Sequence, residues 1–343
     1  MSGGSLSLPV LDLSRLTAGA SARRGFLDAL RQAAHDTGFF YLTGHGVPAS
    51  FNAAVLEQAA QFFALPQARK DAVAMVRSPH FRGYNRAGLE LTRGQPDWRE
   101  QIDIGAERGA VPDPLDGPAY RRLQGPNQWP AELPDFRTTV LTWQDAVTNV
   151  LVRLLRAFAL ALGQDEDVFG PVYDGSPHQL LKLIRYPGQD DGSSGQGVGA
   201  HKDSGLLSLI LQDGQGGLEI EVAPHVWIPA PPRPDAFVVN IGELLELATG
   251  GYLRATVHRV VSPPARQVRL SAAFFLGARL DATMPVLRLP AEFAAAAGGV
   301  TQDPDNPLFR QVGLNTLKGR LRSHPDVARR HHADLLEPAG QAL

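Results

Sequence analysis

The 343-residue chain contains no cysteine, so it can form neither a disulfide bond nor a metal site with thiolate ligands. It has no run of eighteen apolar residues, the length that a membrane-spanning helix needs. Its formal net charge is −2 and basic residues form no cluster, which argues against nucleic acid as a partner. The first residues lack the features of a secretory signal. We therefore expect a cytoplasmic protein whose partners include neither a membrane nor nucleic acid, and the oligomeric state stays open.

Three segments show the spacing of amphipathic helices, with apolar residues at steps of three and four. They are residues 22–36, 50–63 and 135–162, and Gly163 follows the third where a C-terminal cap is expected. Residues 105–134 are rich in proline and glycine and indicate an extended connection. Residues 188–199 are rich in glycine and polar residues, which indicates a mobile loop of the kind that often acts as a lid.

Between residues 180 and 276, short alternating or apolar runs separated by turn residues predict a β-sandwich of the jelly-roll type. Within it, residues 206–211 and 218–222 flank an Asp-Gly turn sequence and are expected to form a hairpin. We expect an N-terminal region of helices and strands (1–134), a long helix with a jelly-roll catalytic core (135–290) and a C-terminal helical region (291–343). All three are expected to form one integrated unit.

The most informative residues lie between His201 and Ser271. His201 and Asp203 are separated by one residue, and His258 follows in a strand-like context. Two histidines and one carboxylate on one face of a metal ion leave three coordination positions open, as in non-haem Fe(II) oxygenases. Further along, Arg269 and Ser271 offer the donors that a dicarboxylate cosubstrate needs. This set of residues indicates an oxygenase.

The spacing of His201 and Asp203 suits a β-strand, where side chains two residues apart point to the same side. The chain repeats this spacing at His332 and Asp334. That second pair lies in residues 325–336, where the sequence predicts a helix, and no histidine follows it. Because residues two apart on a helix point in different directions, we reject the second pair as metal ligands.

These motifs belong to a longer ordered series that covers nearly the whole chain. The other segments of the series are residues 8–13, 38–48, 81–84, 97–100, 185–187, 216–219 and 239–243. In these segments and in their order, the chain resembles the isopenicillin N synthase-like branch of the iron- and 2-oxoglutarate-dependent dioxygenases. The resemblance implies a mainly β fold with flanking helices, built on a distorted double-stranded β-helix (jelly roll).

The resemblance also implies Fe(II) and 2-oxoglutarate as cofactors. The iron ligands would be His201, Asp203 and His258, and the positive charge left on the site would favour an anionic chelating cosubstrate. Dioxygen and a small organic substrate would complete the reaction. A C–H bond of that substrate would be hydroxylated or desaturated while succinate and CO2 are released.

By the same resemblance, the distal carboxylate of 2-oxoglutarate would bind Arg269, with help from Ser271 and Tyr186. Arg266 competes with Arg269 for this role, but it has no serine two residues later and stands beside a Pro-Pro turn. The chain departs from the family pattern at Ile184, two positions before Tyr186, where asparagine is common.

The candidates for the substrate pocket are Lys182, Phe275, Phe81 and Arg82. By the period of two, Lys182 shares a strand face with Tyr186, and Phe275 shares one with Arg269. A lysine in an apolar cavity needs an anion, which an acidic or phenolic substrate would supply. Alternatively, Lys182 lies at the exposed start of its strand and pairs with a surface carboxylate.

Other polar residues receive ordinary structural interpretations. His45 is expected to be a structural hydrogen-bonding residue, and Asn240 and Gly242 are expected to shape a turn beside the metal strands. Three further histidines are expected to face solvent or to cap an element: His178, His225 and His324.

Three alternatives to a hydroxylase or desaturase stay open at this point. The first is an oxidase of the same fold that does not use 2-oxoglutarate. The second is an enzyme that fragments 2-oxoglutarate itself into ethylene and succinate. The third is a metal-free jelly-roll protein that binds or senses a ligand.

Overall fold

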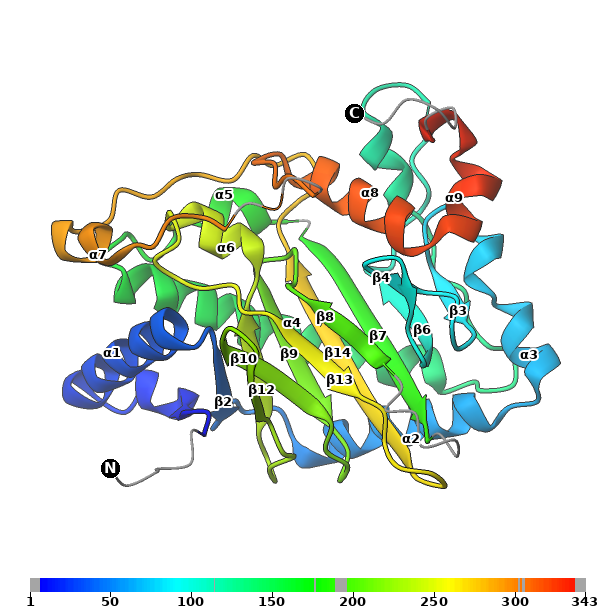
Figure 1. The fold of residues 1–343 in the computed structure, drawn as a ribbon, viewed down its shortest axis with the longest axis horizontal. Coiled ribbons are helices and arrows are strands. Elements are labelled where there is room, and N and C mark those ends of the chain that lie inside the picture. Colours follow the sequence, from blue (N-terminus) through cyan, green and yellow to red (C-terminus); the bar gives the residue numbers. More distant parts are fainter. Residues whose placement is uncertain are drawn as a thin grey trace.

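The structure, a computed structural model, describes residues 7–336 except 114, 176, 189–195, 302, 304 and 305. Its centre is a pair of β-sheets (Figure 1). The larger sheet has the strand order β1-β2-β12-β9-β14-β7-β6-β3, and the smaller sheet has the order β11-β10-β13-β8. This arrangement confirms the expected jelly-roll core with flanking helices.

In sheet order, the larger sheet contains β1 (Val10–Asp12), β2 (Phe39–Thr43), β12 (Phe237–Ile241), β9 (Leu207–Gln212), β14 (Val268–Gly277), β7 (His178–Pro187), β6 (Glu100–Gly105) and β3 (Gly83–Asn85). The smaller sheet contains β11 (Val226–Pro229), β10 (Leu218–Ala223), β13 (His258–Val261) and β8 (Gln196–His201). A separate hairpin pairs β4 (Leu91–Thr92) with β5 (Gln95–Pro96). Because β1 and β2 extend the same sheet as β12, the N-terminal region is joined directly to the core.

The α-helices are α1 (Ala20–Asp36), α2 (Ala49–Ala64), α3 (Gln67–Ala72), α4 (Phe136–Ala161), α5 (Gly170–Tyr173), α6 (Glu243–Ala248), α7 (Ala291–Ala296), α8 (Val312–Ser323) and α9 (Pro325–His331). Short 3-10 helices cover Leu13–Leu16, Met75–Arg77, Ala119–Leu123 and Ala333–Leu335. The three helices predicted from spacing are α1, α2 and α4. Among the described residues, none of the helices combines the length and apolar character needed to cross a membrane.

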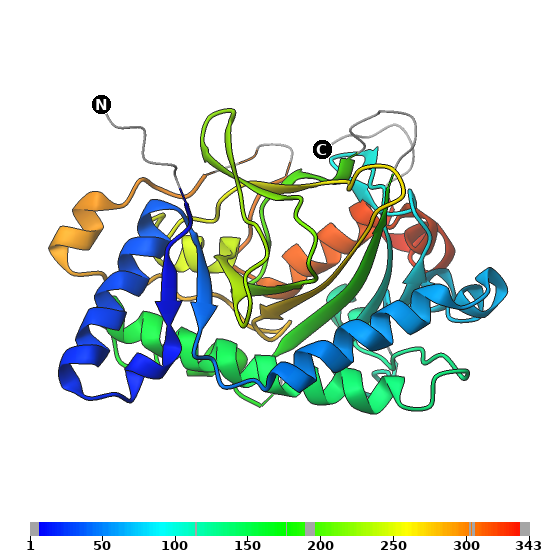
Figure 2. The ribbon, with the colours of Figure 1, turned by 90° about the horizontal axis from the view of Figure 1, so that it is seen from below.

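Helices α2 and α4 cover the outer face of the larger sheet, where they lie side by side (Figure 2). The apolar stripe of α4, which includes Val147, Leu151 and Phe158, belongs to the main hydrophobic core. The helix ends at Ala161 with Leu162 as its C-cap, and Gly163 follows with φ +69°, a left-handed conformation that favours glycine. The predicted helix and its cap are therefore confirmed.

Strand β14 shows how the two faces of the larger sheet divide the protein. Ala272, Phe274 and Leu276 point to the main core, which α2 and α4 cover. Ala273 and Phe275 instead belong to a second apolar cluster, which fills the space between the two sheets. We call that space the interior. By the period of two, Arg269 and Ser271 also face the interior.

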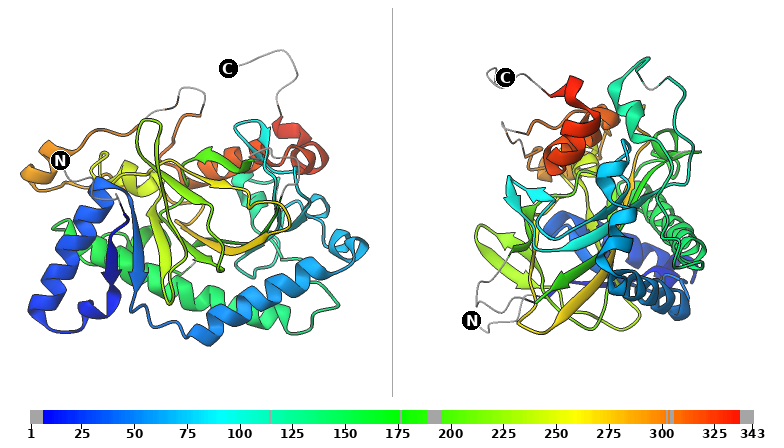
Figure 3. Two further views of the ribbon diagram at one scale, coloured as in Figure 1. Left: turned by 60° about the horizontal axis from the view of Figure 1, so that its bottom comes forward. Right: turned by 90° about the vertical axis from the view of Figure 1, so that its right-hand side faces the viewer.

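Helices α8 and α9 lie at the β3 and β6 end of the larger sheet. Figure 1 shows them beside β4 and β3. In both views of Figure 3 these helices, drawn in orange and red, lie close to the cyan hairpin of β4 and β5. The C-terminal segment is therefore placed to contribute side chains to this end of the interior.

Two expectations about strands need correction. Residues 206–211 and 218–222 do not pair with each other, because β9 pairs with β12 and β14 while β10 pairs with β11 and β13. The physical reason is burial: nearly every residue of β9 is buried, on both of its faces, which suits a central strand, whereas β10 alternates between buried and partly exposed residues and suits the outer sheet. The expected loop over residues 188–199 is shorter than predicted, since β8 begins at Gln196. Residues 189–195 of that loop lie outside the described residues.

Candidate metal centre and active site

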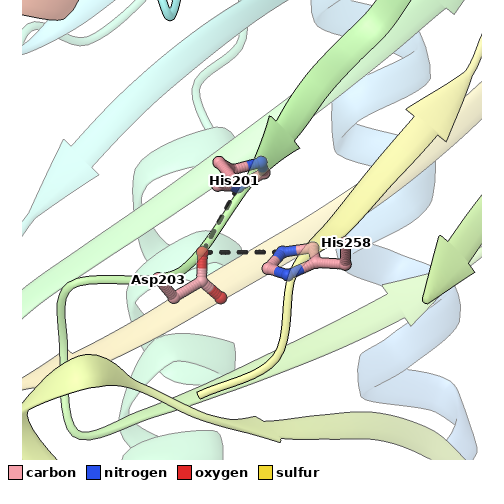
Figure 4. Close-up of side chains that lie close together, drawn as sticks. All are labelled: His201, Asp203 and His258. Carbon is pink, nitrogen blue, oxygen red and sulfur yellow. Dashed lines mark ion pairs between the residues drawn. The ribbon is translucent and has the colours of Figure 1, made fainter. Parts of the chain in front are cut away.

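Three side chains converge at the edge of the smaller sheet. His201 ends β8, Asp203 lies two residues later, and His258 begins β13 opposite His201 in the strand register. The Asp203 Oδ1 atom lies 3.4 Å from Nε2 of His201 and 3.6 Å from Nε2 of His258. Figure 4 shows the three side chains directed at one another. Among the described residues they form the one group of this kind whose ligand atoms all lie within 4.8 Å of one another.

Both histidines are oriented by backbone carbonyls. Nδ1 of His201 lies 2.8 Å from the Gly199 carbonyl oxygen, and Nδ1 of His258 lies 3.2 Å from that of Thr256. An Nδ1–H that donates to a carbonyl leaves Nε2 as the lone-pair nitrogen, which is the atom that a metal ion binds. Both Nε2 atoms face the Asp203 carboxylate, so the donor set is prepared for a shared cation.

The second oxygen of Asp203 is held by two hydrogen bonds. Oδ2 accepts from the Ser208 hydroxyl at 2.6 Å and from the Asn240 side-chain amide at 2.8 Å. These bonds fix the carboxylate so that Oδ1 points to the histidines. The turn interpretation of Asn240 missed this contact. At Gly242 the backbone passes close to Gly205, because a Cβ at residue 242 would lie 2.1 Å from the Gly205 carbonyl oxygen.

The electrostatics of the three residues favour a bound cation. Burial alone would raise the pKa of Asp203, but the two histidines and the Ser208 hydroxyl hold it well below its usual range. Burial lowers the pKa of His258 to about 4, so this imidazole is neutral at neutral pH. Burial also opposes protonation of His201, yet its contacts with Asp203 and the Gly199 carbonyl outweigh burial and raise its pKa. A divalent metal ion would take the place of that proton.

Arg269 lies inside the protein, with only 1% of its surface exposed. Its Nη1 donates to the Ser271 hydroxyl at 3.2 Å, and its Nη2 donates to Oε1 of Gln212 at 3.0 Å. The guanidinium lies over the Tyr186 ring, 4.9 Å from the ring centroid, and its Nε is buried without a partner. By contrast, Arg266 is exposed in the turn before β14. A buried guanidinium with an unused N–H fits a carboxylate ligand.

Strand β9 connects this arginine to the metal site. Ser208, which holds Asp203, and Gln212, which holds Arg269, lie on the same face of β9. Opposite them on β14 lie Phe275 and Ser271. Gln212 and Ser208 were not singled out from the sequence, because a polar residue within a buried strand has no local motif to mark it.

Beyond the metal site, the interior contains a set of ionic residues that we call the charge network. Each of its members is less than a tenth exposed. They are Glu90, Asp97, Arg99, Asp103, Lys182, Arg320 and His324.

Lys182 is the centre of the charge network. Its Nζ lies 2.6 Å from Oε1 of Glu90 and 3.8 Å from Oδ2 of Asp103. It stands opposite Ala273 of the interior cluster in the register of β7 and β14. Lys182 therefore shares the interior, and the surface interpretation is wrong. The argument for an acidic or phenolic substrate also loses its basis, because Glu90 supplies the anion.

The remaining ion pairs tie the network together. Arg99 lies 2.9 Å from Glu90 and 3.3 Å from Asp97, and Arg320 of α8 lies 2.8 Å from Asp103. Asp97 also accepts a hydrogen bond from the Gly199 backbone N–H at 3.1 Å. Since the Gly199 carbonyl orients His201, the network is linked to the metal site through a single residue.

The other candidate residues lie around this region. Phe81 is fully buried among residues of the C-terminal helices and stacks on His332 with ring centroids 5.1 Å apart. Arg82 is buried and donates to the backbone carbonyls of His80, Phe81 and Leu123. Phe81 and Arg82 therefore contact neighbouring side chains and backbone carbonyls, beside the charge network.

The remaining histidines have structural positions. His45 is buried and accepts from the Val47 backbone N–H, and His225 is exposed, as expected. His324 is the C-cap residue of α8 and the N-cap residue of α9, which is one of the two expected roles, and it is fully buried near Glu90 instead of facing solvent. His178 is partly buried.

The rejected second pair also has structural contacts. His332 is hydrogen-bonded to the Pro79 carbonyl, and Asp334 pairs with Arg122 at 2.8 Å. These two side chains therefore belong to the packing of the C-terminal segment.

The jelly roll and the two-histidine, one-carboxylate site define a non-haem iron oxygenase. Comparison with known proteins gives the same class. Residues 8–132 match the model for the N-terminal region of the non-haem dioxygenase in morphine synthesis, and residues 177–278 match the model for the 2OG-Fe(II) oxygenase superfamily.

Two relatives illustrate the similarity in sequence. The 2-oxoglutarate-dependent dioxygenase frbJ of Dothideomycetidae sp. (strain 11243) is 36% identical, covering 94% of this chain and 90% of its own. A homoarginine-6-hydroxylase of Glycine max is 32% identical, covering 82% of this chain and 88% of its own.

Two solved structures share the fold. A full-length Neurospora crassa protein, in complex with alpha-KG and thymine, superposes with a TM-score of 0.74 at 25% identity, covering 97% of this chain and 99% of its own. A putative 2OG-Fe(II) oxygenase family protein of Caulobacter crescentus gives a TM-score of 0.74 at 28% identity, with 91% and 98% covered. The chain belongs to the 2OG-Fe(II) oxygenase superfamily. It is an Fe(II)- and 2-oxoglutarate-dependent dioxygenase that acts on a small substrate.

Proposed function

We propose that this enzyme hydroxylates a small zwitterionic substrate of the amino-acid class. The observation that supports this proposal is the charge network, which shares the interior with the metal site. It presents carboxylates and cations within one buried region, and Asp97 links it to the residue that orients His201. The ion pairs of the network already balance one another, and a zwitterion brings both signs of charge together, so it adds little net charge to this buried region.

Three polar atoms in or beside this region are buried without a partner: Nε of Arg99, Nη2 of Arg320 and Oε1 of Gln101. Buried polar groups are nearly always hydrogen-bonded, so these atoms are candidates to contact a polar ligand. One relative is named as a homoarginine-6-hydroxylase, and homoarginine is an amino acid with a cationic side chain. This relative supports the same substrate class.

We assign the iron to His201, Asp203 and His258, whose ligand atoms lie close together. The other ring nitrogen of each histidine and the other oxygen of Asp203 already form hydrogen bonds within the protein. We assign the distal carboxylate of 2-oxoglutarate to Arg269, with Ser271 and Tyr186 beside it. When bound, the iron and 2-oxoglutarate supply an oxidative decarboxylation that is coupled to oxidation of a substrate C–H bond. The protein orients the substrate, and its apolar interior excludes water.

A second candidate substrate is a planar heterocycle. Phe275 supports it, because its ring faces the interior opposite Ser208 and offers a surface for stacking. The Neurospora crassa protein, which shares the fold, is described in complex with thymine.

A substrate panel distinguishes the two proposals. Succinate is measured with Fe(II), 2-oxoglutarate and either homoarginine, arginine, lysine, thymine or a planar aromatic acid, and products are examined for one added oxygen atom. The first proposal expects a hydroxylated product from one of the amino acids. Hydroxylation of thymine or the aromatic acid alone would contradict it, and ethylene formed without any added substrate would indicate fragmentation of 2-oxoglutarate.

A further inference from the structure

A small pocket lies where β6 ends and β7 begins, separate from the metal site. Its volume is about 20 Å³, enough for one water-sized or chloride-sized occupant. The polar side chains that line it are Arg82, Arg108, Gln124, His178 and Gln179. The pocket therefore presents two guanidinium groups, an imidazole and two amides, but no carboxylate.

The two arginines of this pocket lack an acidic partner. Among the residues that the structure describes, no carboxylate forms an ion pair with Arg82 or Arg108. Arg82 is only 4% exposed, and its Nη1 and Nη2 donate to backbone carbonyls. Its Nε is buried without a partner. A buried guanidinium without a counter-ion is costly, so an anion would stabilise it.

The surroundings increase the positive potential. Arg320 of α8 acts on both Arg82 and His178, and its ion pair with Asp103 is shared with Lys182. Burial, followed by the nearby arginines, holds the pKa of His178 well below its usual range, so this imidazole is neutral. Burial and Arg320 also lower the pKa of Arg82 to about 9, against the opposing effect of Asp103. The balance of these groups favours a negatively charged occupant.

We propose that the pocket of Arg82, Arg108 and His178 binds a small anion, either a halide ion or the carboxylate of a short organic acid. The pocket volume excludes larger polyanions from full entry. Arg82 already joins the loop at Leu123 to strand β6, since its guanidinium packs against Gly105, where a Cβ would lie 2.4 Å away. An anion beside it would therefore stabilise the contact between this loop and the larger sheet.

The test compares anions at constant ionic strength. The thermal midpoint of the full chain is measured as chloride or acetate replaces gluconate, an anion too large for the pocket. Binding is expected to raise Tm by roughly 2 °C or more when the anion is well above its Kd. A rise in Tm with chloride but not with acetate identifies the occupant as a free inorganic ion. A larger rise in Tm with acetate than with chloride identifies the occupant as the carboxylate of an organic acid.

Arg108→Gln is the informative variant, because Arg108 makes one backbone contact, to the Pro177 carbonyl, whereas Arg82 holds three carbonyls and its loss endangers folding. The matched control is Arg24→Gln on the exposed surface of α1. The proposal expects the anion response to be lost in Arg108→Gln and kept in Arg24→Gln. An equal response in both variants, or no response in the unmodified chain, overturns it.

A crystal soaked in bromide gives a direct second measurement. The expected result is an anomalous scattering peak within hydrogen-bond distance of Nε of Arg82. A bromide-soaked crystal with peaks only elsewhere contradicts the proposal.

Discussion

The two ends of the interior differ in how their polar groups are satisfied. At the metal end, Asp203 faces two imidazole nitrogens, and Nε of Arg269 has no partner. At the other end, Lys182 and Arg99 share the Glu90 carboxylate, so most charges cancel within the protein. The metal end is completed by ligands, whereas the charge network is organised mainly by its own ion pairs.

The two ends therefore obtain their stability from different sources. A metal site gains further free energy when its ion binds, so the effect of removing a ligand on stability is larger in the presence of that ion than in its absence. A buried ion pair is different, because removing one partner leaves an uncompensated charge whether or not a ligand is present. Substitutions at the two ends should therefore be separable by measuring stability and activity together.

The largest expected effect is at the metal ligands. We expect His201→Ala, Asp203→Ala or His258→Ala to abolish oxidation, because a site with two ligands holds Fe(II) poorly. Succinate production under limiting iron measures this, and His225→Asn is the control, since His225 is exposed. Full turnover by any of the three alanine variants would remove the assignment.

The charge network gives the next largest effect. Lys182→Ala leaves Glu90 with an incomplete set of cations, so we expect a loss of roughly 3–5 kcal/mol in the free energy of unfolding without any ligand. Lys182→Ala should also impair substrate oxidation, while succinate formation that is not coupled to substrate oxidation remains. Phe275→Ala should show the same kinetic effect without the loss of stability. Denaturant unfolding measures the stability of each variant, and product analysis measures substrate oxidation. The double variant Lys182→Met with Glu90→Gln should recover part of the stability, and stability unchanged in Lys182→Ala contradicts the account.

Substitution of Arg269 should change ligand affinity by a free energy similar in size to the loss of stability expected for Lys182→Ala. We expect Arg269→Ala to weaken 2-oxoglutarate binding by about 2–5 kcal/mol, because the carboxylate loses its charged partner in a buried site. Iron binding should persist, and the measurement is the 2-oxoglutarate dependence of succinate formation. Arg266→Ala is the matched control, and a larger effect in that variant would place the carboxylate elsewhere.

The smallest expected effect is at Asn240, which positions a ligand without touching the metal. We expect Asn240→Ala to lower iron affinity roughly 10- to 100-fold, the usual result of losing a hydrogen bond to a metal ligand. Iron titration checks this, and Asn240→Asp tests whether the donor is required, because a carboxylate beside Asp203 would repel it. Unchanged affinity in both variants would make the hydrogen bond incidental.

The two ends also differ in how far the sequence predicts them. His201, Asp203, Arg269 and Ser271 stand in pairs two residues apart. This spacing places Arg269 and Ser271 on one face of β14, and it places Asp203 just beyond the end of β8, close to His201. The residues of the charge network come from the segments that flank the β4–β5 hairpin, from β6, β7 and α8, and from the junction of α8 and α9, far apart in the chain. Their contacts depend on how the segments around the β4–β5 hairpin and α8 pack against β6 and β7, which no local pattern encodes. Lys182 could therefore be placed on the correct face but not paired with Glu90.

The same limit applies to the fold. Helix α4 and its Gly163 cap follow from local spacing and backbone conformation. The false hairpin arose because adjacent runs usually pair, whereas here β9 and β10 separate into opposite sheets. The role of Asn240 was missed for a related reason, since its partner Asp203 lies on a different element.

Anaerobic titration with Fe(II) and 2-oxoglutarate tests the central claim most directly. Chelation of iron by 2-oxoglutarate in the metal site produces a weak visible charge-transfer absorption, and dioxygen should then discharge it with formation of succinate. The account predicts this band in the unmodified enzyme, its loss in His258→Ala, and its appearance only at higher 2-oxoglutarate concentration in Arg269→Ala. A band of undiminished intensity in His258→Ala, or none in the unmodified enzyme, would contradict the account.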